Sequence, residues 1–315
     1  MKGWKTMLGA GALAGAVEYG IAAYFFRRTM LRQNATTERT MEMSGTNWAN
    51  YMPMIEAMKE WMLKQPREDV YIRSEDGLRL HATYFPGEGG KKLVICFHGY
   101  TSKGMSDYIG LSNYYLQRGY QMLLVDERAH GDSEGTYIGF GCLDRRDALL
   151  WIRYGEERLG KDCEIWLHGT SMGGATVLMA SGLKLPPTVK GIVSDCAFTS
   201  AWDVFAHVLK SQYHLPAFPI LHIADGMVKD RAGYGLAQCN AAKEVRKAKV
   251  PILLIHGNED TFVPCRMCYE IYENCAAPKE MLIIHGAGHC ESFYKEKDQY
   301  EKKLTAFLEK RGALL

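Results

Sequence analysis

One serine of this 315-residue chain lies in a setting that suits a nucleophile. It is Ser171, within the run Gly169-Thr170-Ser171-Met172-Gly173. Apolar runs on both sides predict a buried strand before the serine and a buried helix after it. Glycines two places on either side permit a tight strand–turn–helix junction that exposes the hydroxyl. The pattern predicts Ser171 as the nucleophile and the Met172 amide, at the helix N-terminus, as an oxyanion donor.

A serine hydroxyl needs a base to take its proton and a carboxylate to orient that base. Two further apolar runs downstream predict strands, and Asp260 and His289 lie in the loops that follow them. Catalytic groups in open α/β sheets gather beyond the carboxyl ends of the strands. We therefore expect Ser171, Asp260 and His289 to form a triad. Asp195, which also follows a predicted strand, is the alternative acid.

Several other histidines precede glycines, some of them at predicted strand ends, and we expect each to be structural. They are His98, His130, His168, His256 and His285.

Five segments, in this order along the chain, resemble the α/β-hydrolase superfamily. They are Cys96 to Thr101, Asp126 to Gly135, Gly169 to Gly173, His256 to Asp260, and Gly288-His289. More narrowly, they look like the serine-aminopeptidase-like and monoglyceride-lipase-like hydrolases, including membrane-anchored bacterial members. The resemblance covers residues 68 to 312. It implies a second oxyanion donor, the amide that follows His-Gly, which here belongs to Tyr100.

The composition predicts one globular catalytic domain, because 47% hydrophobic and 23% charged residues suffice for one large core. The net charge of +2 and the scattered Lys and Arg argue against a nucleic-acid partner. Strand-like and helical runs alternate from Lys92 onward, which predicts a mostly parallel sheet with helices on both faces. This is the α/β-hydrolase fold that the resemblance implies. Asp76-Gly77 predicts a hairpin that opens the sheet with an antiparallel pair.

The alternation is interrupted between residues 197 and 249, a stretch too long for an ordinary crossover. It predicts a helical cap over the site, with an extension of the helical layer as the alternative. Its apolar side chains favour an apolar acyl or aryl group. The predicted substrate contacts are Trp202, Phe205 and Phe218. The hydrolase core is then divided into residues 68–196 and 250–315.

The first 28 residues predict a membrane anchor. Met7 to Phe26 has the length of about 20 residues that a span needs, although Glu18 near its middle costs roughly 2.5 kcal/mol. A cleaved signal peptide is the alternative. Gly11 and Gly15 lie on one helical face, which favours pairing of two such helices in a homodimer.

Residues 29–67 predict a polar linker followed by an amphipathic helix, because apolar side chains recur at near-helical spacing from Trp48 to Met62. A catalytic unit that begins near Thr46 is expected to be active without the anchor. The nine cysteines are odd in number and scattered. This favours a reducing compartment and hence a cytoplasmic catalytic domain.

These features predict a serine hydrolase that cleaves carboxylic esters of small to medium apolar acyl or aryl groups through an acyl-enzyme. Its partner is a small-molecule ester or lipid substrate, and no metal or organic cofactor is expected. The alternatives are a lysophospholipase or monoglyceride lipase, a serine peptidase or thioesterase, and a catalytically silent binding protein.

Overall fold

The computed structural model describes the backbone of residues 2–33 and 46–312, and the side chains of residues 15–33 and 46–310. The linker expected at residues 35–45, and the side-chain surroundings of Gly11, lie outside the described residues.

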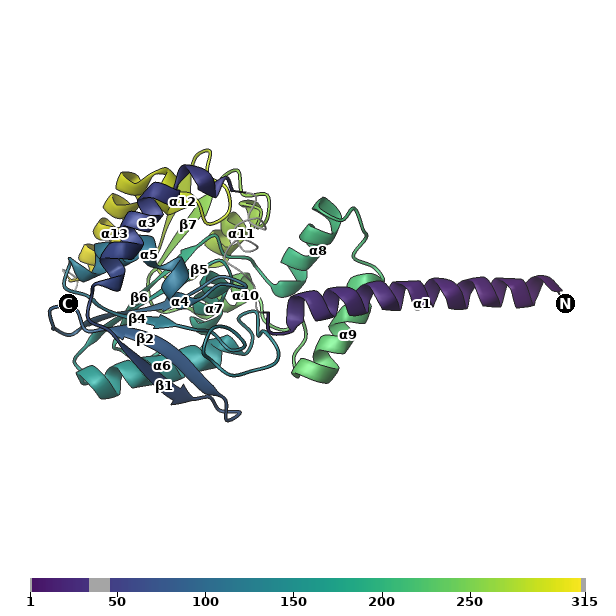
Figure 1. Cartoon of the computed structure of the whole chain (residues 1–315), viewed down its shortest axis with the longest axis horizontal. Coiled ribbons are helices and arrows are strands. Elements are labelled where there is room, and N and C mark those ends of the chain that lie inside the picture. The colour runs from purple at the N-terminus through teal and green to yellow at the C-terminus, as the bar shows by residue number, and fades with distance from the viewer. Residues whose placement is uncertain (1, 34–45, 313–315) are drawn as a thin grey trace.

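A single eight-stranded sheet forms the centre of the described structure (Figure 1). Its order is β1-β2-β4-β3-β5-β6-β7-β8. The strands are β1 (Glu68–Arg73), β2 (Arg79–Phe85), β3 (Lys92–Phe97), β4 (Gln121–Val125), β5 (Glu164–Thr170), β6 (Val189–Asp195), β7 (Ile252–Gly257) and β8 (Lys279–Ile284). β2 pairs antiparallel with both β1 and β4, and all other pairs are parallel. The predicted sheet and its opening hairpin, with Gly77 at a φ of +87°, are confirmed.

Helices cover both faces of this sheet (Figure 1). Successive side chains of a strand point to opposite faces, so Leu93 and Ile95 of β3 enter one apolar core while Val94 and Cys96 enter another. The first core includes side chains of α6 (Asp144–Leu159), α7 (Met172–Ala180) and α11 (Arg266–Asn274). The second includes side chains of α3 (Met52–Leu63), α5 (Ile109–Leu116) and α13 (Lys297–Gly312). The predicted amphipathic helix is therefore α3, which packs on its own domain.

The cap segment, residues 197–249, lies between β6 and β7 and is mainly helical. It contains α8 (Ala201–Ser211), α9 (Ile220–Ala232), α10 (Ala241–Glu244) and the short helix η2 (Val245–Lys247). The Ser200 side chain caps α8 by accepting a hydrogen bond from the Asp203 amide. In Figure 1, α8 and α9 project from the body on the side where the N-terminal helix lies.

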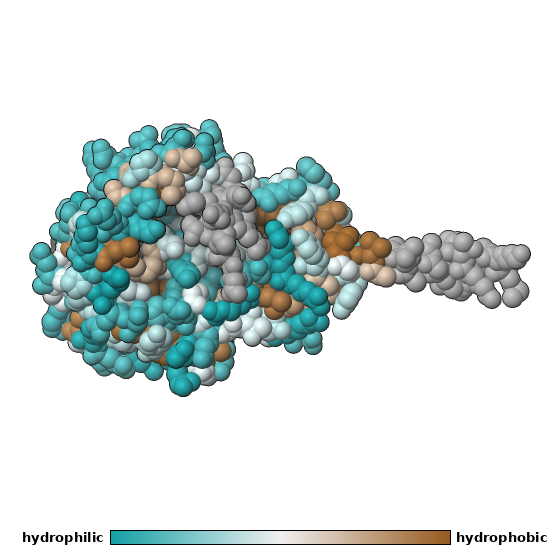
Figure 2. Space-filling model, viewed as in Figure 1, coloured by the Kyte–Doolittle hydropathy of each residue, from teal (hydrophilic) through white to brown (hydrophobic). Residues whose placement is uncertain are grey.

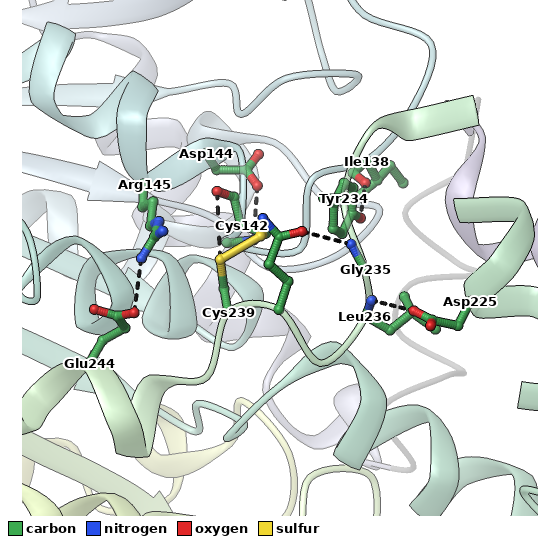
Figure 3. Close-up of a disulfide and its surroundings, with 12 residues drawn as sticks. Ile138, Cys142, Asp144, Arg145, Asp225, Tyr234, Gly235, Leu236, Cys239 and Glu244 are labelled. Carbon is green, nitrogen blue, oxygen red and sulfur yellow. Dashed lines mark hydrogen bonds and ion pairs between the residues drawn. A yellow bond between two sulfur atoms is a disulfide. The ribbon is translucent and has the colours of Figure 1, made fainter. Parts of the chain in front are cut away.

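A disulfide ties the end of the cap segment to the core. It joins Cys142, in the loop before α6, to Cys239, with 5.3 Å between the two Cα atoms. Beside it, Arg145 of α6 forms an ion pair with Glu244 of α10 at 3.2 Å (Figure 3). The loop before α6 and the region after α9 are therefore fixed to each other.

This pairing corrects the reading of the cysteines. Seven other cysteines of the described residues are free. Disulfides persist mainly in oxidising compartments. The cysteines therefore no longer favour a cytoplasmic catalytic domain.

The N-terminal helix is α1 (Lys2–Met30). Its N-terminal end projects away from the body, and its last turns pack beside α9 (Figure 1). Ala22, Phe26 and Met30, spaced four residues apart, are 2% exposed or less and belong to the first core. The prediction that the membrane span extends to Phe26 is therefore wrong, because Phe26 packs inside the protein.

Among the described residues, no helix is both long enough and apolar enough to cross a membrane. Apolar surface gathers where α1 leaves the cap segment (Figure 2). Val17 of α1 is 54% exposed. Gly15 is exposed in this chain and has open space around it.

Candidate active site

Ser171 occupies a strained turn between β5 and α7, with φ 53° and ψ −110°. Only glycine fits at the positions two residues before and two residues after Ser171. A Cβ at Gly169 would lie 2.1 Å from the Gly173 carbonyl oxygen, and a Cβ at Gly173 would lie 2.0 Å from that of Phe97. The spacing read from the sequence thus has a steric cause, and the turn places the serine beyond the end of β5.

Ser171, His289 and Asp260 come together at the carboxyl ends of their strands. Ser171 Oγ lies 2.8 Å from His289 Nε2, and His289 Nδ1 donates to Asp260 Oδ2 at 2.7 Å. The other Asp260 oxygen accepts from the amides of Phe262 at 3.0 Å and Val263 at 2.7 Å. The carboxylate is thereby held by its own loop, and it orients the imidazole toward the serine.

The charges in this relay stabilise one another. Burial alone would raise the pKa of Asp260, but His289 and hydrogen bonds from His256 and His289 hold it below its usual range. Burial opposes a charge on His289, yet the Asp260 carboxylate raises the pKa of that imidazole well above 6.5. The imidazolium that forms when His289 takes the Ser171 proton is therefore stabilised, as general-base catalysis requires.

His256 is a site residue that the sequence reasoning treated as structural. Its Nε2 lies 3.3 Å from Asp260 Oδ2 and 2.8 Å from the Val263 carbonyl oxygen. It braces the loop that holds the carboxylate. Its place four residues before Asp260, at the end of β7, is the signal that could have indicated this contact.

Asp195, the alternative acid, lies in the site in a different role. It is the last residue of β6, and its carbonyl oxygen accepts from the Ser171 amide at 2.8 Å. Burial raises the pKa of its carboxyl to about 6. The carboxylate that faces His289 Nδ1 is that of Asp260.

The two residues expected to supply oxyanion donors border the same space as Ser171: Met172 follows it, and Tyr100 lines both cavities that Ser171 lines. Met172 is the first residue of α7, and amides of a first helical turn have no partner within their helix. A Cβ on Gly99 would lie 3.4 Å from Ser171 Cβ, so the backbone leading into Tyr100 passes next to the serine. The Asp107 carboxylate accepts from the Gly99 amide at 2.6 Å and holds this loop.

Two cavities meet at Ser171. The larger, of about 270 Å³, combines apolar and charged side chains, and its lining includes Trp48, Met52, Glu56, Lys59, Lys103, Asp107 and Tyr294. The smaller, of about 120 Å³, lies between α1, α8 and α9 and is almost wholly apolar, with a lining that includes Phe25, Phe26, Met30, Phe140, Phe205 and Leu221. Tyr100, Ser171 and Phe262 border both cavities.

Of the three expected substrate contacts, Phe205 lines the smaller cavity. Trp202 and Phe218 line neither cavity and instead contact His222, with ring centroids 4.9 and 5.2 Å apart. Phe218 is 70% exposed. Which aromatic residues face the site depends on how α8 and α9 pack, and composition alone does not contain this information.

Two groups of described side chains have the donor types and spacing to hold a metal ion. They are Cys196, His289 and Cys290, and His81, Asp126 and Asp132. Both histidines already use their two nitrogens in hydrogen bonds, His289 with Ser171 and Asp260, and His81 with Asp126 and Asp69. We assign neither group a metal.

Comparison with known proteins indicates the same fold class. A family model described as alpha/beta hydrolase fold matches residues 92–218, and one described as serine hydrolase (FSH1) matches residues 168–291. The chain is 26% identical to the uncharacterised protein YqkD of Bacillus subtilis, over 97% of each chain. It is 24% identical to the lysophosphatidylserine lipase ABHD12 of Danio rerio, over 60% of this chain and 48% of that protein.

A solved structure shows the same architecture. The esterase Pf2001 of Pyrococcus furiosus superposes with a TM-score of 0.66 at 23% identity, covering 79% of this chain and 92% of that chain. The sheet and these matches lead to one conclusion: the chain has the α/β-hydrolase fold, and parts of it match an alpha/beta hydrolase model and a serine hydrolase model.

Proposed function

We propose that this protein is a serine hydrolase that cleaves carboxylic esters with small to medium apolar acyl groups. The observation that carries the proposal is the relay from Asp260 through His289 to Ser171, with links of 2.7 and 2.8 Å, at the junction of two cavities. A nucleophile, a base and an orienting carboxylate in this order are the requirement for acyl transfer.

In the first half-reaction, Ser171 Oγ attacks the ester carbonyl carbon while His289 Nε2 takes the hydroxyl proton. The Asp260 carboxylate stabilises the imidazolium that results. The amides of Tyr100 and Met172 donate to the tetrahedral oxyanion. His289 then gives its proton to the leaving alcohol, and the acyl group stays on Ser171.

In the second half-reaction, His289 takes a proton from a water molecule, whose oxygen attacks the acyl carbonyl. The same two amides stabilise the second oxyanion. Collapse of this intermediate returns the proton to Ser171 Oγ and releases the carboxylic acid.

The lining of the cavities supports the assignment of substrate ends. The acyl group fits the smaller cavity, whose aromatic and aliphatic walls accept apolar carbon and whose lining includes one charged residue, Arg28. The cap segment supplies part of this wall through Phe205 and Leu221. The alcohol part of the ester is then expected to bind in the larger cavity.

A lysophospholipase or monoglyceride lipase is the second candidate. It is favoured by the mixed lining of the larger cavity, where Lys59 and Lys103 accompany Glu56 and Asp107. Such a lining suits a polar or charged alcohol such as a glycerol or phosphoester head group. The name of the relative ABHD12, a lysophosphatidylserine lipase, agrees with this candidate.

The test is a substrate panel with the full-length chain and a Ser171→Ala control. The panel contains p-nitrophenyl esters from acetate to octanoate, a monoacylglycerol, a lysophospholipid and an aminoacyl p-nitroanilide. We expect ester hydrolysis, with kcat lower by roughly 10⁴-fold in Ser171→Ala. Hydrolysis of the anilide alone would identify a peptidase, and turnover of no substrate by the folded protein would favour a binding protein.

A further inference from the structure

We infer that the N-terminal helix α1 is one wall of the acyl-binding site and selects the acyl group of the substrate. The inference rests on the proposed ester hydrolysis at Ser171 and assigns this helix a role inside the site. The ligand is an apolar acyl chain of several carbons, with its carbonyl at Ser171.

Two turns of α1 face the smaller cavity. Phe25, Phe26, Thr29 and Met30 line it together with side chains of α8 and α9. The Phe25 ring contacts the Tyr213 ring of the cap segment edge to face, with centroids 4.8 Å apart. α1 and the cap segment therefore form two facing walls of this cavity, and without α1 one of these walls would be missing.

The end of α1 is held in register by main-chain hydrogen bonds to the loop before α6. Met30 O accepts from the Ile138 amide at 2.8 Å, and the Arg32 amide donates to Thr136 O at 2.8 Å. The same loop is bonded to the cap segment, because Tyr234 Oη donates to Ile138 O at 2.6 Å (Figure 3). Helix, loop and cap segment are thus joined through neighbouring atoms, which is the rigidity a specificity wall needs.

α1 also contacts the loop that carries an oxyanion donor. Tyr100 Oη donates to the Arg28 carbonyl oxygen at 3.1 Å, and the Tyr100 ring stacks on Phe140 with centroids 5.3 Å apart. Phe140 itself lines the smaller cavity. The helix that contacts the acyl chain therefore also supports the residue whose amide faces the carbonyl.

This assignment adds to the expectation that a unit beginning near Thr46 is active, because such a unit would lack part of the acyl-binding site. Residues 25–30 precede that boundary and supply part of the cavity lining. A chain without them would retain the triad and lack one wall for the acyl group.

The experiment fills the cavity from α1 in the full-length protein. Thr29→Phe adds a ring on the cavity side, and Thr29→Leu adds a smaller group. Val17→Phe is the matched control, because it places the same ring on an exposed part of the same helix. The readout is the ratio of kcat/KM for p-nitrophenyl octanoate to that for p-nitrophenyl acetate. Circular dichroism reports folding, and a short-chain fluorophosphonate reports whether Ser171 is reactive.

We expect Thr29→Phe to lower this ratio by about 10-fold or more, because a hydrophobic pocket discriminates by 10- to 200-fold per methylene. Thr29→Leu should lower it less, and Val17→Phe should keep the wild-type ratio. A folded, labelled Thr29→Phe variant with the wild-type ratio overturns the inference and leaves the ester hydrolase standing. If Thr29→Phe does not fold, the same ratio in Thr29→Leu decides. Absence of Ser171 labelling in the wild type would instead refute the proposed function.

Discussion

Replacing Asp260 by asparagine should disable His289 while leaving it in place. Oδ1 of Asp260 accepts two backbone amides at 3.0 and 2.7 Å, so the remaining amide oxygen of an asparagine must stay on that side. Its NH₂ group then faces His289 Nδ1, where the carboxylate oxygen was at 2.7 Å. Two donors cannot share this contact, so the imidazole must take the tautomer with a proton on Nε2. That nitrogen can no longer accept the Ser171 proton.

The expected loss in kcat is about 10⁴-fold, the size seen when a triad histidine is held in the wrong tautomer. Loss of a hydrogen bond to a charged group should also lower the free energy of unfolding by about 1 to 3 kcal/mol. The assay is steady-state hydrolysis of p-nitrophenyl butyrate near pH 8, with urea unfolding in parallel. Asp195→Asn is the control, because it makes the same change in a carboxyl that is similarly buried at the next strand end.

Asp195→Asn should lose at least 100-fold less activity than Asp260→Asn. The opposite order would assign the acid to β6. A folded Asp260→Asn enzyme within tenfold of wild type would refute the tautomer argument itself.

Three further predictions follow from the site and its supports. The acid limb of the kcat/KM profile should have its midpoint above pH 6.5, because Asp260 raises the pKa of His289 and only the neutral imidazole accepts a proton; a midpoint below 6 would contradict this. Gly173→Ala should prevent folding, because its Cβ would lie 2.0 Å from the Phe97 carbonyl oxygen; a native circular dichroism spectrum would show the turn to be adaptable. Cys142→Ser should lower the free energy of unfolding by about 2 to 4 kcal/mol through loss of a 97-residue cross-link; unchanged urea unfolding under oxidising conditions would mean that the disulfide does not form.

Much of the site could be predicted from the sequence, because its residues follow from the geometry of single turns and of parallel strands. The glycines around Ser171 could be interpreted because their spacing follows from steric contact within one turn. Asp260 and His289 could be predicted from the sequence because parallel strands bring their carboxyl ends to one edge of the sheet. Residues far apart in sequence can therefore be assigned to one place. The hairpin at Gly77 could be predicted for the same reason, because its turn signal lies between the two strands that it joins.

What the sequence did not contain was the packing of separate elements on one another. The face of α1 that carries Phe26 and Met30 is apolar whether it meets lipid or protein, and only the docking on α9 decides between them. Likewise Trp202 and Phe205 are both aromatic residues of α8, but Phe205 alone of the two lines the cavity. The pairing of Cys142 with Cys239 depends on the same nonlocal contacts.

The most direct test of the account is the site of covalent labelling by a fluorophosphonate probe. The reagent reacts with a serine whose hydroxyl is activated by a neighbouring base. Mass spectrometry of the full-length protein should find one adduct, on the peptide that contains Ser171, and none in Ser171→Ala or His289→Ala. An adduct on another residue, or a folded wild-type protein that takes up no label, would contradict the claim that Ser171 is the nucleophile.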